Sequence, residues 1–278
     1  MKIKLAMLGF CLVTGAVQAQ IYFRAGIGYA LPAAQENIGN NESEVVNGNN
    51  YYATVEPVKA SYGAGINFSV GSGYKFTKVI GADLGITYLS GKTYKTQYDY
   101  NEVGFGSEKL DTESKSTGVF FTPAILITPD DKLPYVRMGV VMGMPKIKGT
   151  DSYFVNFDGD VQASSDWEQR KNMAFGFQGA IGMQWSLVGS VKLFTEVNFT
   201  TMTYYPGEKV STSYVVNGQN RLDEIEQYFK KTIYKDKVEY GTSINFEEPS
   251  EEAQVSIPFS SLSFQVGIVY TLGGIQLE

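Results

Sequence analysis

Alternation of apolar and polar residues is the dominant pattern along this chain. In segment 172–187 nearly every second residue is large and apolar, and the residues between them are small or polar. The apolar positions are Met173, Phe175, Phe177, Ile181, Met183, Trp185 and Leu187. A period of two residues is typical of a β-strand with one apolar and one polar face. The segment therefore predicts a long strand whose two faces meet different surroundings.

The same alternation occurs in seven further segments. They cover residues 21–30, 60–70, 79–90, 118–127, 134–145, 191–202 and 259–272. Eight such segments are an even number, as single-chain bacterial barrels require. They predict an all-β fold, a membrane-spanning antiparallel up-and-down β-barrel, with the apolar faces toward lipid and the polar faces lining the lumen.

Short and long connections alternate between these segments. The short ones are 71–78, 128–133 and 188–190, and the long ones are 31–59, about 95–115, 146–170 and 206–257. Short turns on the side of both termini and long loops on the other side are typical of outer-membrane barrels. We expect the long loops to be extracellular and to contain hairpins at Asn-Gly pairs. Residues 221–233 have apolar residues at helical spacing, so a short helix or a polar loop is expected there.

A ten-stranded barrel is the architectural alternative. It would require another membrane hairpin from residues 206–257, but that region is rich in charged residues. Charged side chains on a lipid-facing strand are destabilising. Eight strands are therefore the favoured prediction.

Residues 1–19 have the composition of a secretory signal peptide. Lys2 and Lys4 precede an apolar stretch, and a small-x-small cleavage motif ends at Ala19. Such a leader is removed on export and is not part of the fold. We expect residues 20–278 to form a single barrel domain.

Composition argues against several classes of function. The chain has no histidine, so neither Ser-His-Asp nor Cys-His catalysis can be assembled. Cys11, the only cysteine, lies in the leader after the bulky Phe10, which is a poor setting for lipidation and leaves no cysteine for metal binding. Removing Lys2 and Lys4 from the 23 basic residues leaves 21 against 29 acidic residues, a net charge of −8. We expect no catalytic residues, no cofactor, no metal and no nucleic-acid partner.

Four charged residues fall on the polar faces of the predicted strands. They are Arg24, Asp83, Arg137 and Glu196, on the first, third, fifth and seventh segments. Because buried charges must be paired and these signs alternate, we predict one neutral charge network inside the barrel. The network is either a plug that fills the lumen or a constriction that selects solutes. Catalysis by Asp83 and Glu196 would need a raised pKa, which neighbouring arginines oppose.

The last segment ends in a recognisable motif. Gln265, Gly267, Tyr270 and Leu272 occupy the polar, glycine, aromatic and hydrophobic positions of a pattern that resembles the C-terminal β-signal of outer-membrane proteins. Residues 21–29 resemble the start of small OmpA/OmpX-type, porin-like barrels. The resemblance implies a bacterial outer-membrane location, contact with outer-membrane lipid, and recognition by the barrel-assembly machinery. It implies no substrate.

Two functions follow from these observations and stay open at this point. The first is a non-enzymatic envelope or surface-interaction role, in which the long acidic loops contact an extracellular ligand or surface partner. The second is a narrow porin-like channel for small solutes or apolar ligands. A membrane-embedded enzyme is a third class, which the absence of histidine disfavours.

Overall fold

The computed structural model describes residues 20–129, 134–157, 159–239 and 244–272. The expected leader, residues 1–19, lies outside the described part of the chain. Strands dominate, and the helical elements of the described residues are η2 (Leu222–Glu224) and α2 (Gln227–Lys230). Neither of them is long and apolar enough to cross a membrane.

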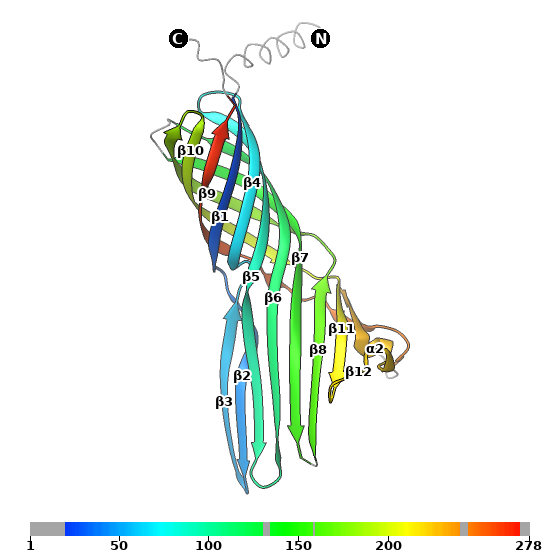
Figure 1. The fold of residues 1–278 in the computed structure, drawn as a ribbon. Coiled ribbons are helices and arrows are strands. Elements are labelled where there is room, and N and C mark those ends of the chain that lie inside the picture. The colour runs from blue at the N-terminus through cyan, green and yellow to red at the C-terminus, as the bar shows by residue number, and fades with distance from the viewer. Residues whose placement is uncertain (1–19, 130–133, 158, 240–243, 273–278) are drawn as a thin grey trace, which may run out of the picture.

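Eight antiparallel strands form a closed ring (Figure 1). In chain order they are β1 (Gln20–Pro32), β4 (Gly65–Lys75), β5 (Ile80–Glu102), β6 (Gly106–Ile127), β7 (Tyr135–Asn156), β9 (Ala174–Val188), β10 (Val191–Tyr204) and β16 (Ser261–Thr271). Each strand pairs with the next one in this list, and β16 pairs with β1. The ring strands fall on the eight alternating segments of the sequence.

Side-chain exposure alternates along the ring strands. In β9, for example, Phe175, Phe177 and Ile181 are 60%, 67% and 60% exposed and point outward, whereas Ala174 and Ala180 are buried inside. The outward apolar residues of the other strands include Ile27, Phe68, Leu84, Phe121, Met138, Phe199 and Phe264. A water-soluble barrel buries its apolar face, so this ring has the opposite arrangement.

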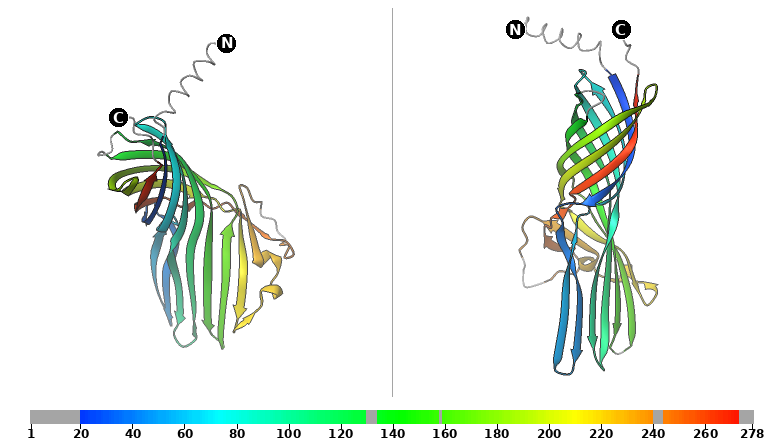
Figure 2. Two further views of the ribbon diagram at one scale, coloured as in Figure 1. Left: turned by 45° about the horizontal axis from the view of Figure 1, so that its top comes forward. Right: turned by 90° about the vertical axis from the view of Figure 1, so that its left-hand side faces the viewer.

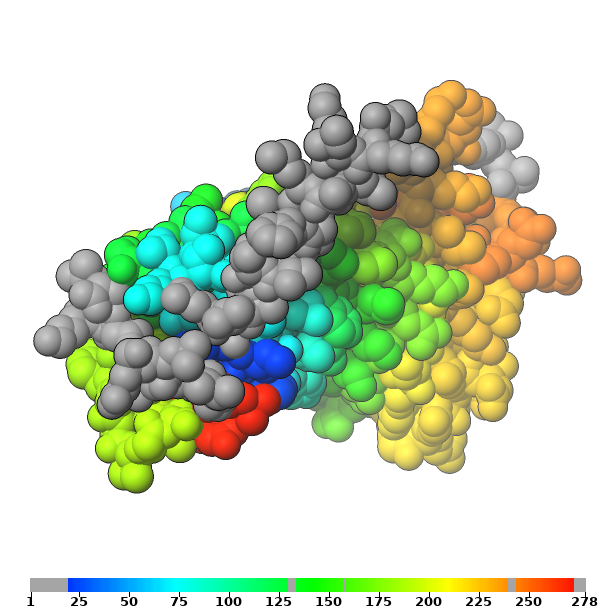
Figure 3. All heavy atoms as spheres, turned by 90° about the horizontal axis from the view of Figure 1, so that it is seen from above, coloured from blue at the N-terminus to red at the C-terminus, as the bar shows by residue number. Residues whose placement is uncertain are grey.

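Three ring strands continue beyond the ring into an open sheet, which we call the outer sheet. β5, β6 and β7 have 23, 22 and 22 residues, against 13 in β1 and 11 in β4. The outer sheet lies at the end of the ring opposite the start of β1 and the end of β16 (Figures 1 and 2). In a view from the end of the ring where β1 starts, the edge of the outer sheet formed by residues 208–235 and 250–253 lies to one side of the ring (Figure 3).

Other strands widen the outer sheet on both sides. β2 (Glu36–Asn47) and β3 (Asn50–Ala60) extend it beside β5, and β8 (Asp160–Arg170), β11 (Glu208–Val216), β13 (Lys231–Lys235) and β14 (Ser250–Ala253) extend it beside β7. The two-residue strands β12 (Gln219–Asn220) and β15 (Ile257–Pro258) pair with β11 and β10. The long loops expected from the sequence are therefore largely strand.

The segment 221–233, where a short helix or a polar loop was expected, contains two short helical elements. Only η2 and the single turn α2 are helical, and at Lys231 the chain becomes extended and pairs with β11. The described residues of the segment 206–257 also add no strand to the ring, because their longer strands pair with β8 and with one another.

Two tyrosines near the ends of alternating segments, where the headgroup region of a membrane would favour amphipathic rings, lie inside the molecule instead. Tyr62 is 7% exposed and Tyr204 is fully buried. Tyr62 precedes β4, which begins at Gly65, where a φ of +141° redirects the backbone and breaks the alternation. Tyr204 continues the inward face of β10 after Met202. Both belong to the closure of the ring described below.

Candidate functional site

The interior of the ring contains a buried charge network. Arg24 of β1 forms a bidentate pair with Asp83 of β5, through Nη2–Oδ1 at 2.9 Å and Nε–Oδ2 at 3.1 Å. Arg137 of β7 joins Asp83, at 3.1 Å, to Glu196 of β10, at 2.7 Å. The four side chains are between 1% and 8% exposed. The structure thus brings together all four charged residues on the predicted polar faces, as a linear chain of alternating sign that we call the ion network.

Two tyrosines complete the carboxylates of the ion network. The hydroxyl of Tyr22 donates to Asp83 Oδ2 at 2.8 Å, and that of Tyr135 donates to Glu196 Oε2 at 3.0 Å. Sequence reasoning missed both residues. A signal was present, since each tyrosine lies two positions before an arginine of the network and residues i and i+2 share a strand face. The repeated Tyr-x-Arg pattern of β1 and β7 therefore marks this layer.

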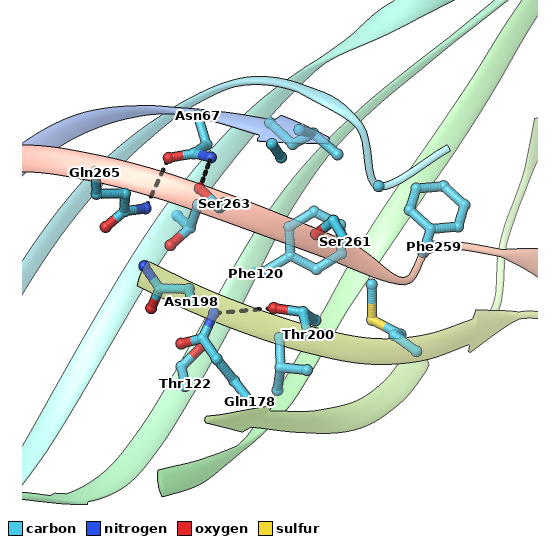
Figure 4. A pocket seen from close by; sticks show the side chains of 16 residues that line it. Asn67, Phe120, Thr122, Gln178, Asn198, Thr200, Phe259, Ser261, Ser263 and Gln265 are labelled. Carbon is cyan, nitrogen blue, oxygen red and sulfur yellow. Dashed lines mark hydrogen bonds between the residues drawn. The ribbon is translucent and has the colours of Figure 1, made fainter. Parts of the chain in front are cut away.

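A layer of amides and hydroxyls lies next to the ion network, on the side of the outer sheet. Figure 4 shows the hydrogen bonds within this layer. Gln265 donates to Asn67 at 2.7 Å, Asn67 donates to Ser263 at 2.8 Å, and Gln178 donates to Thr200 at 3.1 Å. These residues line a cavity of about 50 Å³. A polar cavity of this size is large enough for water.

Aromatic side chains close the ring beyond this layer. Phe259 packs against Tyr62, Tyr204 and Phe120, with ring centroids 6.1, 5.8 and 6.4 Å apart. The segment that carries Phe259 is tied to the ring by backbone hydrogen bonds from Phe259 N to Met202 O and from Tyr62 N to Pro258 O. We call these four rings, together with Tyr94, the aromatic cap. Side chains therefore fill the interior at two levels, the ion network and the aromatic cap.

The residues of the expected assembly signal lie at the seam where the ring closes. Gln265 and Gly267 face inward on β16, and Tyr270 faces outward and is 46% exposed. Leu272 follows the end of β16 and donates its backbone N–H to Ile21 O at 2.9 Å. A Cβ atom added at Gly267 would lie 2.1 Å from Ala25 O, so the close approach of β1 requires glycine there.

The described residues contain no group of three His, Cys, Asp or Glu side chains arranged to hold a metal ion. The carboxylates of the ion network are occupied by arginine and tyrosine donors. The arrangement can neutralise and fill the lumen, and it offers no open ligand position of its own.

No family model and no curated protein matches the sequence. Among solved structures the chain is similar to CarO2 of Acinetobacter baumannii, with 11% identity over 91% of this chain and 99% of that one, at a TM-score of 0.33. It is also similar to CarO of the same organism, with 11% identity over 90% and 97% of the two chains, at a TM-score of 0.30. Scores this low do not establish a common fold.

Proposed function

We propose that this chain is a non-enzymatic outer-membrane β-barrel whose lumen is sealed and whose outer sheet is a contact surface at the cell exterior. The ring would be the membrane-spanning part, and the outer sheet would project from it. The observation that carries the proposal is that side chains fill the interior of the ring at two levels, the ion network and the aromatic cap.

The exterior of the ring supports a membrane location. All eight strands carry large exposed apolar side chains on their outward face, whereas the charged side chains of the ion network and the amides beside it point inward. The shorter ring strands have 11 to 15 residues, and about 9–11 tilted residues are enough to cross a bilayer. Exposed apolar area on this scale is stable only when lipid or protein covers it.

The interior supports a surface role over a channel. A solute passing through the ring would have to displace both the ion network and the aromatic cap. The ion network is neutral and hydrogen-bonded, so opening it would expose unpaired charges in a narrow space. The outer sheet, in contrast, contains about half of the described chain and has exposed aromatic residues such as Tyr51, Tyr52 and Phe105.

Single-channel recording in planar bilayers tests this proposal. We expect the purified, folded protein to insert without producing stable conductance steps. Protease treatment of intact cells should cleave the tip of the outer sheet, for example near Gly104, and leave a protected ring fragment. Ion-selective conductance of the wild-type protein would replace this proposal with the narrow channel. Failure to fractionate with the outer membrane would refute the membrane role itself.

A further inference from the structure

A second charge cluster lies where the ring passes into the outer sheet. Glu168 of β8 pairs with Lys146, Lys148 and Arg170 at 3.3, 3.7 and 3.5 Å. Glu208 of β11 pairs with Arg170, Lys171 and Lys231 at 2.9, 2.8 and 3.1 Å. We call the five cations the basic rim. Together with the two carboxylates they form one connected cluster with a net charge of +3.

The positive charge of this cluster is the part that faces outward. The Glu168 and Glu208 side chains are only 10% and 3% exposed, whereas those of the basic rim are 32% to 66% exposed. Burial opposes ionisation of Glu208, but hydrogen bonds from Lys171, Arg170 and Lys231 lower its pKa to about 2. Glu208 therefore stays ionised at neutral pH and holds its three cations in place.

Neighbouring charges on the same face do not cancel this excess. Lys115 lies directly opposite Lys148 in the β6–β7 register. Glu113, one step further out, pairs with Lys95, and Asp166 accepts a hydrogen bond from Thr150. These two cations and two carboxylates sum to zero, so the local charge remains +3 in a protein whose total charge is −6.

The basic rim begins where the apolar exterior ends. On β7 the outward face contains Met138, Val140, Met142 and Met144 and then changes to Lys146 and Lys148. Lys146 is two residues beyond Met144, about 7 Å along the strand. The headgroup layer occupies roughly 5–7 Å on each side of the hydrocarbon core. The end of β8 lies at the same level, because Glu168 and Gln169 pair with Lys148 and Ile147 in the β7–β8 register.

We propose that the basic rim binds the phosphate of an anionic lipid headgroup in the outer leaflet. This inference rests on the proposed membrane role, which places the rim at headgroup depth. Lysine supplies three donors as a compact charge, and arginine can bind phosphate oxygens through two parallel N–H groups. The buried glutamates use only part of that donor capacity. A lipid is favoured over a free phosphate because Met144 provides a surface for acyl chains beside the charges.

Lipid binding to the full chain, folded in uncharged maltoside micelles, tests the proposal. Phosphatidic acid, which has a bare phosphate headgroup, is compared with phosphatidylcholine of the same acyl chains by native mass spectrometry. We expect the wild-type protein to retain phosphatidic acid preferentially and to lose it as salt is raised. Lys146→Gln with Lys148→Gln should weaken retention roughly 25-fold, since each cation near an anionic surface contributes about fivefold.

A matched control removes two other lysines. Lys109 and Lys235 each pair with one carboxylate on the outer sheet and are about as exposed as Lys146. Lys109→Gln with Lys235→Gln should leave retention within about twofold of the wild-type value. An equal loss in both double variants, or no preference for phosphatidic acid, would overturn the proposal.

Two further measurements separate the possible failures. Inorganic phosphate that displaces phosphatidic acid at equal concentration would show that the rim takes free phosphate and not lipid. Insertion into phosphatidylcholine vesicles is measured on the same wild-type preparation. A protein that inserts but shows no phosphate preference refutes only the lipid site, whereas a protein that does not insert refutes the proposed function.

Discussion

Removing Arg137 is the most informative perturbation of the ion network, because among the described residues it is the only arginine bound to Glu196. Without Arg137, the Tyr135 hydroxyl is the one hydrogen-bond partner left to the Glu196 carboxylate in the described part of the chain, whereas Asp83 keeps its bidentate pair with Arg24. Breaking a buried pair costs about 3–5 kcal/mol. We therefore expect Arg137→Met to lower the free energy of unfolding by about 4 kcal/mol.

The reciprocal change should be milder. Glu196→Met leaves Arg137 paired with Asp83, so its loss is mainly that of charge-assisted hydrogen bonds, about 2 kcal/mol. The double variant removes Arg137 and Glu196 together, so neither charge is left without its partner. The Arg24–Asp83 pair stays intact. Its cost should be about 3 kcal/mol less than the sum of the two single costs, near the upper range for contacting residues.

Urea unfolding in phospholipid vesicles, followed by the fluorescence of Trp167 and Trp185, measures these differences. A control cycle combines Glu196→Met with Gln178→Met. Gln178 pairs with Thr200, which is four residues from Glu196 on β10, so the two changed positions are about 13 Å apart along the strands. Residues at that separation should give additive costs. If the Arg137 and Glu196 costs also add within about 0.5 kcal/mol, the two residues do not act as a buried pair and the network assignment fails.

Three other predictions concern separate parts of the chain. Phe177→Arg places a cation on the outward face and should cost about 2–4 kcal/mol in vesicles if it lies near the midplane, whereas Gln178→Arg points inward and should escape that lipid cost; the opposite ranking would reverse the two faces. Tyr270→Ala removes an exposed aromatic side chain and should reduce outer-membrane insertion in cells, while Phe264→Ala, at a similarly exposed position on the same face of β16, should not. Equal insertion of both variants would contradict the assembly-signal interpretation. The pKa of Glu208 is lowered from 4.5 to about 2, so the stability that this carboxylate contributes should be fully present above about pH 4.5 and lost as the pH falls toward 2. Limited proteolysis of the 206–216 segment across that pH range should show this loss in the wild-type protein and not in Glu208→Gln.

The ring was predictable because each of its strands separates two environments. Wherever one face is apolar and exposed and the other is polar and enclosed, the sequence must alternate, as 172–187 does. The outer sheet has no such constraint. β3, for example, is exposed over nearly its whole length, so its sequence shows no period that distinguishes a strand from a loop. Residues 95–115 and 146–170 were expected as loops for the same reason.

The interior was partly predictable from sequence. Face and charge alone placed Arg24, Asp83, Arg137 and Glu196 on one side of their strands, and the cost of an unpaired buried charge implied that they meet. The aromatic cap was not predictable, because Phe259 and Tyr62 lie outside the regularly paired strands. There the alternation of inward and outward positions no longer tells which way a side chain points. The basic rim was missed as well, since its partners come from segments whose strands carry no alternation.

The continuity of β5, β6 and β7 from the ring into the outer sheet has a consequence for how this protein can vary in length. β6 and β7 keep one alternation of inward and outward side chains throughout, so inserting one residue within either would turn every later side chain to the opposite face. β5 differs, because its register shifts between Ser90 and Thr93 and its alternation changes there. The β2–β3 hairpin and the 206–257 segment are connected along the chain to the ring outside those strands, so a length change at their tips leaves the alternation of β6 and β7 unchanged. Insertions, epitope tags and natural length differences should therefore be tolerated at the Gly48 and Gly218 turns, where an added side chain meets no neighbour, and rejected near Thr112.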